Sequence, residues 1–224
     1  MPRGKILVIR GGAIGDFILT LPVFSALRQQ FSGAHLEVLG YPHIANLAFA
    51  GGLVEQIRSI EARPLAQFFA RGGDLSDELR DYFSSFAIII SYLYDPDKVF
   101  QTNVALCSKA QFIAGPHRPD EKLKLHATKT FLQPLERLAI FDTDPIPGLN
   151  LSKDDSVNRL SASPMLALHP GSGSERKNWP ETKWAELLAK LLAETNFNFL
   201  LIGGEAEGTR LQSLSAKLSS KRFQ

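Results

Sequence analysis

The fold depends on the stretch Lys5-Ile6-Leu7-Val8-Ile9-Arg10-Gly11-Gly12-Ala13-Ile14-Gly15-Asp16. Its apolar run is typical of a strand buried on both faces, and the glycines that follow predict a tight turn. Apolar residues then recur at helical spacing up to Phe31, and Pro22 must either open this helix or kink it. We therefore expect a strand, a glycine loop and a helix, which is the repeating unit of parallel sheets.

The same alternation continues along the first two thirds of the chain. Further strands are expected at 35–41, 56–60, 87–94 and 111–114, an amphipathic stretch at 74–83, and helical segments at 97–107 and 127–138. Pro42 is expected to close the second strand, and the segment 45–50 is notable only for its small residues. Strands that alternate with helices predict an α/β fold with a doubly wound, parallel, Rossmann-like sheet.

A second unit begins after a polar stretch rich in proline, glycine, aspartate and serine. Its expected elements are a strand at 165–169, a helix with Pro180 in its first position, a strand at 197–202 and a helix at 205–218. We expect an N-terminal domain at 1–145, a linker at 146–163 and a second domain at 164–224. The second domain is expected to be incomplete, because two parallel strands leave unpaired edges and bury little area.

Composition restricts the class of protein. With 44% hydrophobic and 21% charged residues, the 224-residue chain is neither disordered, collagen-like nor a disulfide scaffold. The net charge of +2 does not indicate a nucleic-acid-binding surface, and a single cysteine, Cys107, favours a reducing compartment. The apolar run near the N-terminus is too short for a signal peptide, and no run is long enough to span a bilayer.

The first glycine loop is a candidate site because it connects the carboxyl end of a strand to the start of a helix. A dinucleotide-binding fingerprint is disfavoured, since the glycine spacing is wrong and Tyr41 stands where an acid is needed. A Walker loop is absent. Two interpretations of Asp16 remain open: it caps the helix, or it acts as a general base.

The segment from His169 to Pro180 is a second candidate site, again between a strand and a helix. Glycines allow backbone N–H groups to approach an anion, serine hydroxyls add donors, and a lysine beside a helix start adds charge. A phosphate site is therefore expected at Gly171, Ser172, Gly173, Ser174 and Lys177. The alternative is a flexible surface turn, with Trp179 as a packing anchor.

A third loop follows the expected strand at 197–202. Gly203 and Gly204 precede Glu205 and Glu207, which either complement the helix dipole or hold a ribose diol. The five histidines are scattered, so no metal site is expected, and no nucleophile elbow supports a Ser/His/Asp triad.

Together these motifs resemble those of the glycosyltransferase family 9 heptosyltransferases. The matching residues are the first apolar run with Gly15-Asp16 and Leu21-Pro22, then His169-Pro170-Gly171-Ser172 with Lys177, Trp179-Pro180 and Trp184, and finally Ile202-Gly203-Gly204. Members of this family are GT-B enzymes of lipopolysaccharide core assembly, with two Rossmann-like domains.

The resemblance implies an inverting glycosyltransferase that moves a heptose, or a related sugar, from an ADP-sugar donor to a lipopolysaccharide core acceptor. It implies that Asp16 is the base, that Lys177 contacts the donor phosphates, and that Glu207, or else Glu205, reaches the ribose. The acceptor side is expected to include Gly12, Gly15, Arg63 and Arg118. Neither metal nor cofactor is expected. The implied partners are a nucleotide-sugar donor and an anionic glycolipid acceptor, without nucleic acid, in a cytoplasmic protein with peripheral contact at the inner membrane.

One departure from the family pattern concerns the end of the sequence. Members of the family continue through a Gly-Asn-Asp-Ser-Gly-like segment that completes the donor pocket, and the sequence stops before it at Gln224. A catalytically incomplete or degenerate nucleotide-binding remnant is therefore the alternative function, with an NAD-dependent enzyme as a third. Titration with ADP and with NADH separates these alternatives.

Overall fold

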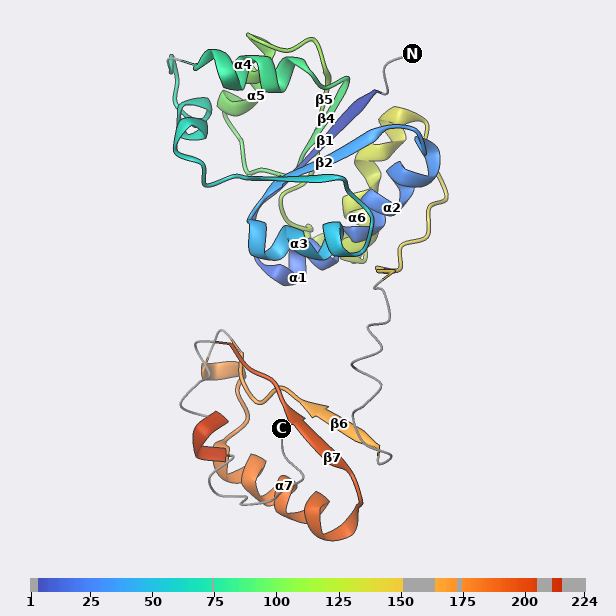
Figure 1. Cartoon of the computed structure of the whole chain (residues 1–224), viewed down its shortest axis with the longest axis vertical. Coiled ribbons are helices and arrows are strands. Elements are labelled where there is room, and N and C mark those ends of the chain that lie inside the picture. Colours follow the sequence, from blue (N-terminus) through green and yellow to red (C-terminus); the bar gives the residue numbers. More distant parts are fainter. Residues whose placement is uncertain (1–3, 74, 151–163, 173–174, 205–210, 215–224) are drawn as a thin grey trace. The chain divides into compact units, whose positions relative to one another are not determined.

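The computed structural model describes residues 4–73, 75–150, 164–172, 175–204 and 211–214 (Figure 1). The chain divides into two compact units, Met1–Ser152 and Lys153–Gln224. Each unit is described by itself.

The first unit is built on a parallel sheet of five strands. In chain order the strands are β1 (Lys5–Arg10), β2 (His35–Gly40), β3 (Gln56–Ser59), β4 (Ile88–Ser91) and β5 (Gln111–Ala114). Their spatial order is β3-β2-β1-β4-β5, and β1 pairs in parallel with β2 on one side and with β4 on the other. The predicted doubly wound sheet is confirmed, with the apolar run of the first motif as its central strand.

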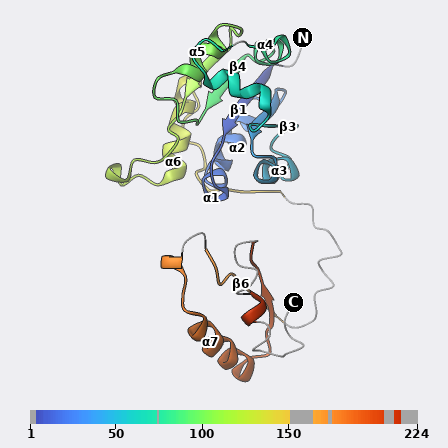
Figure 2. The same cartoon turned by 90° about the vertical axis from the view of Figure 1, so that its left-hand side faces the viewer.

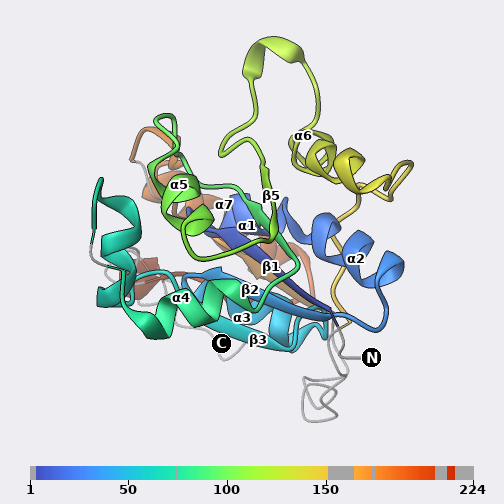
Figure 3. The ribbon, with the colours of Figure 1, turned by 90° about the horizontal axis from the view of Figure 1, so that it is seen from above.

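Helices cover both faces of this sheet (Figures 1 and 3). One face carries α4 (Asp77–Ser84) and α5 (Val99–Ala105) with the 3-10 helix η1 (Arg63–Phe69). The other face carries α1 (Ile14–Ile18), α2 (Leu21–Gln30), α3 (Pro42–Ala50), α6 (Ala127–Leu132) and the 3-10 helix η3 (Gln133–Leu138). A further 3-10 turn, η2 (Glu121–Leu123), lies in the long segment between β5 and α6, which extends away from the sheet in Figure 3.

Two hydrophobic cores explain why the four middle residues of β1, Ile6 to Ile9, are all apolar. Ile6 and Val8 contribute to the core beneath α2, α3 and α6, whereas Leu7 and Ile9 contribute to the core beneath α4 and α5. All four side chains are buried. Because successive side chains of a strand point to opposite faces, a central strand with helices on both sides needs apolar residues throughout.

The structure decides between the two alternatives for Pro22. Pro22 opens the main helix, α2, in its first turn and does not kink it, while the residues before it form the separate short helix α1. Pro42 follows the end of β2, as expected, and is the first residue of α3, which includes the small-residue segment 45–50. Both prolines occupy the first helical turn, where a missing N–H leaves no hydrogen bond broken.

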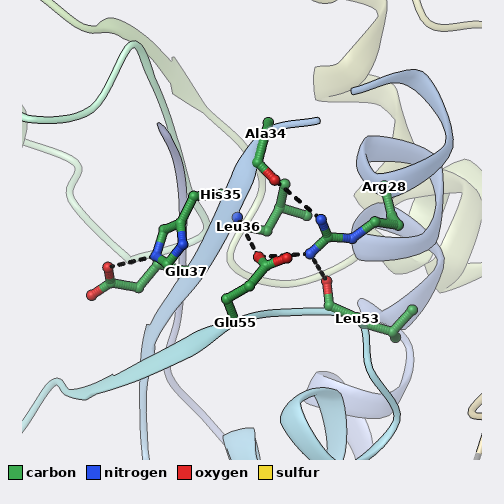
Figure 4. Close-up of polar contacts among 7 residues, drawn as sticks. All are labelled: Arg28, Ala34, His35, Leu36, Glu37, Leu53 and Glu55. Carbon is green, nitrogen blue, oxygen red and sulfur yellow. Dashed lines mark hydrogen bonds and ion pairs between the residues drawn. The ribbon is translucent and has the colours of Figure 1, made fainter. Parts of the chain in front are cut away.

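Arg28 ties three segments together at the edge of the sheet where β2 begins (Figure 4). Its guanidinium donates to the carbonyl oxygens of Ala34 (3.1 Å) and Leu53 (3.0 Å) and to Glu55 Oε2 (2.8 Å). Glu55 Oε2 also accepts the backbone N–H of Leu36 at 2.8 Å. The group therefore holds the end of α2 and the start of β2 to the segment before β3.

The second unit contains the strands β6 (Met165–Leu168) and β7 (Asn198–Leu201), which pair in parallel. Helix α7 (Glu181–Glu194) lies along one side of these strands (Figure 2). Among the described residues of the second unit, the fully buried apolar side chains are those of Leu188, Phe199 and Leu214. Pro180 is the N-cap residue and not, as expected, the first residue of α7. Of the last expected helix, residues 211–214 are helical and the others lie outside the described residues.

Candidate functional site

A pocket of about 520 Å³ opens at the carboxyl edge of the five-stranded sheet. Loops that follow all five strands contribute to it, and β1 and β4 lie where the chain switches from one half of the sheet to the other. This switch point is where doubly wound sheets bind ligands. The lining residues are Arg10, Gly11, Gly12, Ala13, Asp16, Tyr41, Ile60, Glu61, Phe69, Tyr92, Leu93, Tyr94, His117 and Arg118.

The loop between β1 and α1 brings Asp16 to the wall of this pocket. Gly12 adopts a φ of +99°, a conformation that side chains disfavour, and the chain then turns directly into α1. Asp16 lies in the first turn of α1 with its side chain 39% exposed. The N-cap residue of α1 is Ala13, which makes no side-chain capping hydrogen bond, so Asp16 is not the cap residue of this helix.

Arg10, the last residue of β1, is the charged side chain beside Asp16. It is 2% exposed, and its Nη2 lies 4.0 Å from Asp16 Oδ1. Its Nη1 donates to the carbonyl oxygen of His117 at 3.0 Å. Burial lowers the pKa of Arg10, and the charge of Asp16 opposes this shift. The pocket thus contains a carboxylate that is open to solvent and a cation that is not.

An aromatic pair separates this pocket from a neighbouring one of about 250 Å³. The rings of Tyr94 and His117 lie 4.6 Å apart, and both residues line both pockets. Tyr94 is 70% exposed. An exposed aromatic face beside polar groups offers an amphipathic ligand one apolar surface and several hydrogen-bond partners.

The predicted acceptor-side residues are only partly brought together. Gly12 and Arg118 line the pocket with Asp16. Gly15 lies within α1 and Arg63 begins η1, and neither belongs to the lining.

Sequence reasoning missed part of the lining, namely Glu61, Phe69, Tyr94 and His117. Three of these residues follow the carboxyl ends of β3, β4 and β5 within a few positions. That position was the available signal, because the carboxyl ends of parallel strands meet at one edge. Phe69 ends η1, and no local pattern marked it.

The second unit places the predicted phosphate loop between β6 and α7. Gly171 and Ser172 are partly buried, and Lys177 ends the 3-10 helix η5 (Glu175–Lys177) with its side chain exposed. Trp179 packs edge-to-face against Trp184 with ring centroids 5.5 Å apart, as a packing anchor would. Asn178 Oδ1 and Trp184 Nε1 are buried without a hydrogen-bond partner in the part of the chain that the structure describes. An unpaired acceptor and an unpaired donor are costly when buried, so this loop has capacity for a polar ligand.

Four predicted site residues, Gly173, Ser174, Glu205 and Glu207, lie outside the described residues. Gly203 and Gly204 follow β7 and are exposed. Within the described ranges, no three His, Cys, Asp or Glu side chains gather as metal ligands would. The helices in these ranges are also too short or too polar to cross a membrane.

A family model, a relative of known sequence and several solved structures are similar to this chain. The family model described as glycosyltransferase family 9 (heptosyltransferase) matches residues 104–223. A Haemophilus influenzae protein provisionally named a glycosyltransferase is 22% identical over 241 residues, with 97% of this chain and 69% of the relative covered.

Three solved structures with a similar fold are named as a family 9 glycosyl transferase and as heptosyltransferases. A family 9 glycosyl transferase from Veillonella parvula has a TM-score of 0.72 at 17% sequence identity, and the match covers 97% of this chain and 67% of the Veillonella chain. The E. coli ADP-heptose lps heptosyltransferase II has a TM-score of 0.70 at 19% sequence identity, and the match covers 97% of this chain and 70% of the E. coli chain. The E. coli heptosyltransferase WaaC with ADP has a TM-score of 0.66 at 16% sequence identity, and the match covers 98% of this chain and 73% of the WaaC chain. The fold is therefore the GT-B-like α/β fold of these enzymes, and because the family model covers more than half of the sequence, the chain belongs to glycosyltransferase family 9.

Proposed function

We propose that this glycosyltransferase moves a heptose, or a related sugar, from an ADP-sugar to a hydroxyl group of a lipopolysaccharide core acceptor. The observation that carries the proposal is Asp16, a part-exposed carboxylate on the wall of a pocket at the switch point of the sheet. The donor class is suggested by two E. coli WaaC structures, named with ADP and with ADP-2-deoxy-2-fluoro heptose.

The reaction is a single displacement with inversion. Asp16 accepts the proton of the acceptor hydroxyl, and the oxygen forms a bond to the anomeric carbon of the donor sugar. The bond between that carbon and the diphosphate oxygen breaks, and ADP leaves with the electron pair. Proton transfer to a positioned carboxylate needs that carboxylate ionised and accessible, and the exposure of Asp16 meets the second condition.

The two units have different roles in this proposal. The N-terminal unit, residues 1–145, holds the acceptor, with Arg118 at the pocket available to an anionic group of the glycolipid. Residues 164–224 hold the donor. Lys177 and the backbone N–H groups of Gly171 and Ser172 stabilise the charge that grows on the departing diphosphate. Trp184 Nε1 beside this loop is buried without a partner among the described residues, which supports a polar ligand there.

The test is Asp16→Asn, which keeps the shape of the side chain and removes its basicity. Release of ADP from ADP-heptose is measured with core-truncated lipopolysaccharide as acceptor. Turnover should fall by ~10²-fold or more, while ADP affinity measured by calorimetry stays nearly unchanged. Asp16→Asn with wild-type turnover would exclude Asp16 as the base and remove the proposed mechanism.

A further inference from the structure

Arg10 is a buried charge at the end of the central strand, in contact with two loops of the pocket. Its Nη1 donates to the carbonyl oxygen of His117 (3.0 Å), in the loop after β5, and its Nη2 donates to the carbonyl oxygen of Asp16 (3.3 Å), in α1. The Asp16 carboxylate lies 4.0 Å from Nη2. One side chain therefore joins the two segments that supply Asp16, His117 and Arg118.

The surroundings of Arg10 make its charged form energetically unfavourable. Its guanidinium carbon lies 4.5 Å from the ring centre of Phe131 and 5.7 Å from that of Tyr92, and only 2% of the residue is exposed. The faces of these rings recover part of the lost hydration. An apolar residue of similar length would fill this space without the cost of desolvating an ion. The fold alone therefore does not explain an arginine at this position.

We propose that Arg10 is the positioning residue for Asp16: it joins the first turn of α1, through the carbonyl oxygen of Asp16, to the loop after β5, through the carbonyl oxygen of His117. This inference rests on the proposed function. The distance of 4.0 Å between Arg10 Nη2 and the Asp16 carboxylate is too long for a hydrogen bond. Arg10 therefore leaves both carboxylate oxygens available to accept the proton of the acceptor hydroxyl.

Arg28 provides a matched control within the same unit (Figure 4). Like Arg10, it donates to two carbonyl oxygens, contacts one carboxylate and leaves its buried Nε without a partner among the described residues. It lies where β2 begins, at the opposite edge of the sheet from the pocket, and its carboxylate partner is hydrogen-bonded at 2.8 Å. Substitution of Arg28 should therefore cost stability without affecting Asp16.

The experiment compares Arg10→Met, Arg10→Lys and Arg28→Met with the wild type in the whole chain. Release of ADP gives kcat, calorimetry gives the ADP affinity, and urea denaturation gives the free energy of unfolding. Arg10→Met and Arg28→Met should both lose stability, because each removes hydrogen bonds to two carbonyl oxygens. Arg10→Lys keeps a cation but loses the fixed fork of the guanidinium that reaches both carbonyl oxygens.

Arg28→Met should keep the wild-type kcat, because Arg28 contacts the segments where β2 begins and does not line the pocket that contains Asp16.

Both Arg10 variants should lower kcat by roughly 10- to 100-fold, the scale for misplacing a reacting group by ~1 Å, with ADP affinity unchanged. Equal kcat in Arg10→Met and in Arg28→Met would overturn the inference and leave Arg10 a structural residue. If Arg10→Met does not fold, wild-type kcat in Arg10→Lys has the same consequence. Failure of the proposed function is seen separately, as wild-type turnover in Asp16→Asn.

Discussion

Two glycines of the first loop allow its backbone to be tested with a matched pair of substitutions. Gly12 has a φ of +99°, and a Cβ atom built on it would lie 3.5 Å from Asp16 Oδ2, an ordinary contact distance. Gly15 lies within α1, and a Cβ atom there would have nothing within 4 Å. Both positions have room for alanine, so the substitutions differ only in backbone conformation.

The expected effects have opposite signs. In Gly12→Ala an L-residue is held at positive φ, which costs ~1–2 kcal/mol. Either the free energy of unfolding falls by that amount, or the loop relaxes to negative φ and moves Asp16. Gly15→Ala removes freedom from the unfolded chain at a helical position and should raise the free energy of unfolding by ~0.4–1 kcal/mol. The two variants should therefore differ by roughly 1.5–3 kcal/mol.

Urea denaturation followed by circular dichroism measures the free energy of unfolding, and ADP release measures turnover. Gly12→Ala should lose stability, turnover or both, whereas Gly15→Ala should keep its turnover. ADP affinity should not change in either variant. A Gly12→Ala protein as stable and as active as Gly15→Ala would show that the positive φ of Gly12 is not required, and would refute the argument that this turn places Asp16.

Two further predictions concern the other unit and the opposite edge of the sheet. Lys177→Ala should weaken ADP binding by ~1.5–3 kcal/mol, the range for a hydrogen bond to a charged group, and adenosine binding little, with both measured by calorimetry; equal losses would mean that Lys177 shapes the loop. Burial would raise the pKa of Glu55, but the hydrogen bonds from Arg28 and from the Leu36 N–H, with the charge of Arg28, hold it below its ordinary value. The resulting stability is present above the ordinary glutamate pKa, ~4.3, and is lost as pH falls through the lower pKa of the folded state. Glu55→Gln should therefore lower the free energy of unfolding, measured by urea denaturation, at pH 7 and not at pH 3. The loss at pH 7 should be up to about 1 kcal/mol, because the pair is partly exposed. The same loss at both pH values would contradict this account.

The central sheet could be predicted because its signal is local. Ile6 to Ile9 are apolar because both faces of β1 are covered. The strand β5 has one fully buried residue, and the Gly115-Pro116 pair that follows it is the signal that predicts its end. The break between α1 and α2 could not be predicted from apolar spacing, since Phe17, Leu21 and Phe24 keep a helical period across it. Periodicity reports which face is buried and does not report where the backbone hydrogen bonds stop.

The pocket was only partly predictable for a different reason. The glycines and Asp16 form one continuous motif, but their neighbours come from the loops after four other strands. Their distances along the sequence are set by helices whose lengths do not affect the site. His117, for example, reaches Arg10 across 107 positions. Such contacts follow from strand order, and strand order was not available from the sequence.

Asp16 and Arg10 are best explained together. The interpretation of Asp16 as the helix cap does not fit α1, because the N-cap residue is Ala13 and Asp16 lies inside the first turn. Its charged neighbour is an arginine that is almost wholly buried, although the core around it is aromatic and could accept an apolar side chain. A protein gains little stability from a buried cation whose carboxylate partner is 4.0 Å away and part-exposed. The same arrangement holds the backbone of Asp16 at the pocket while Arg10 leaves its carboxylate oxygens available to a substrate, so one chemical requirement, a positioned base, accounts for both residues.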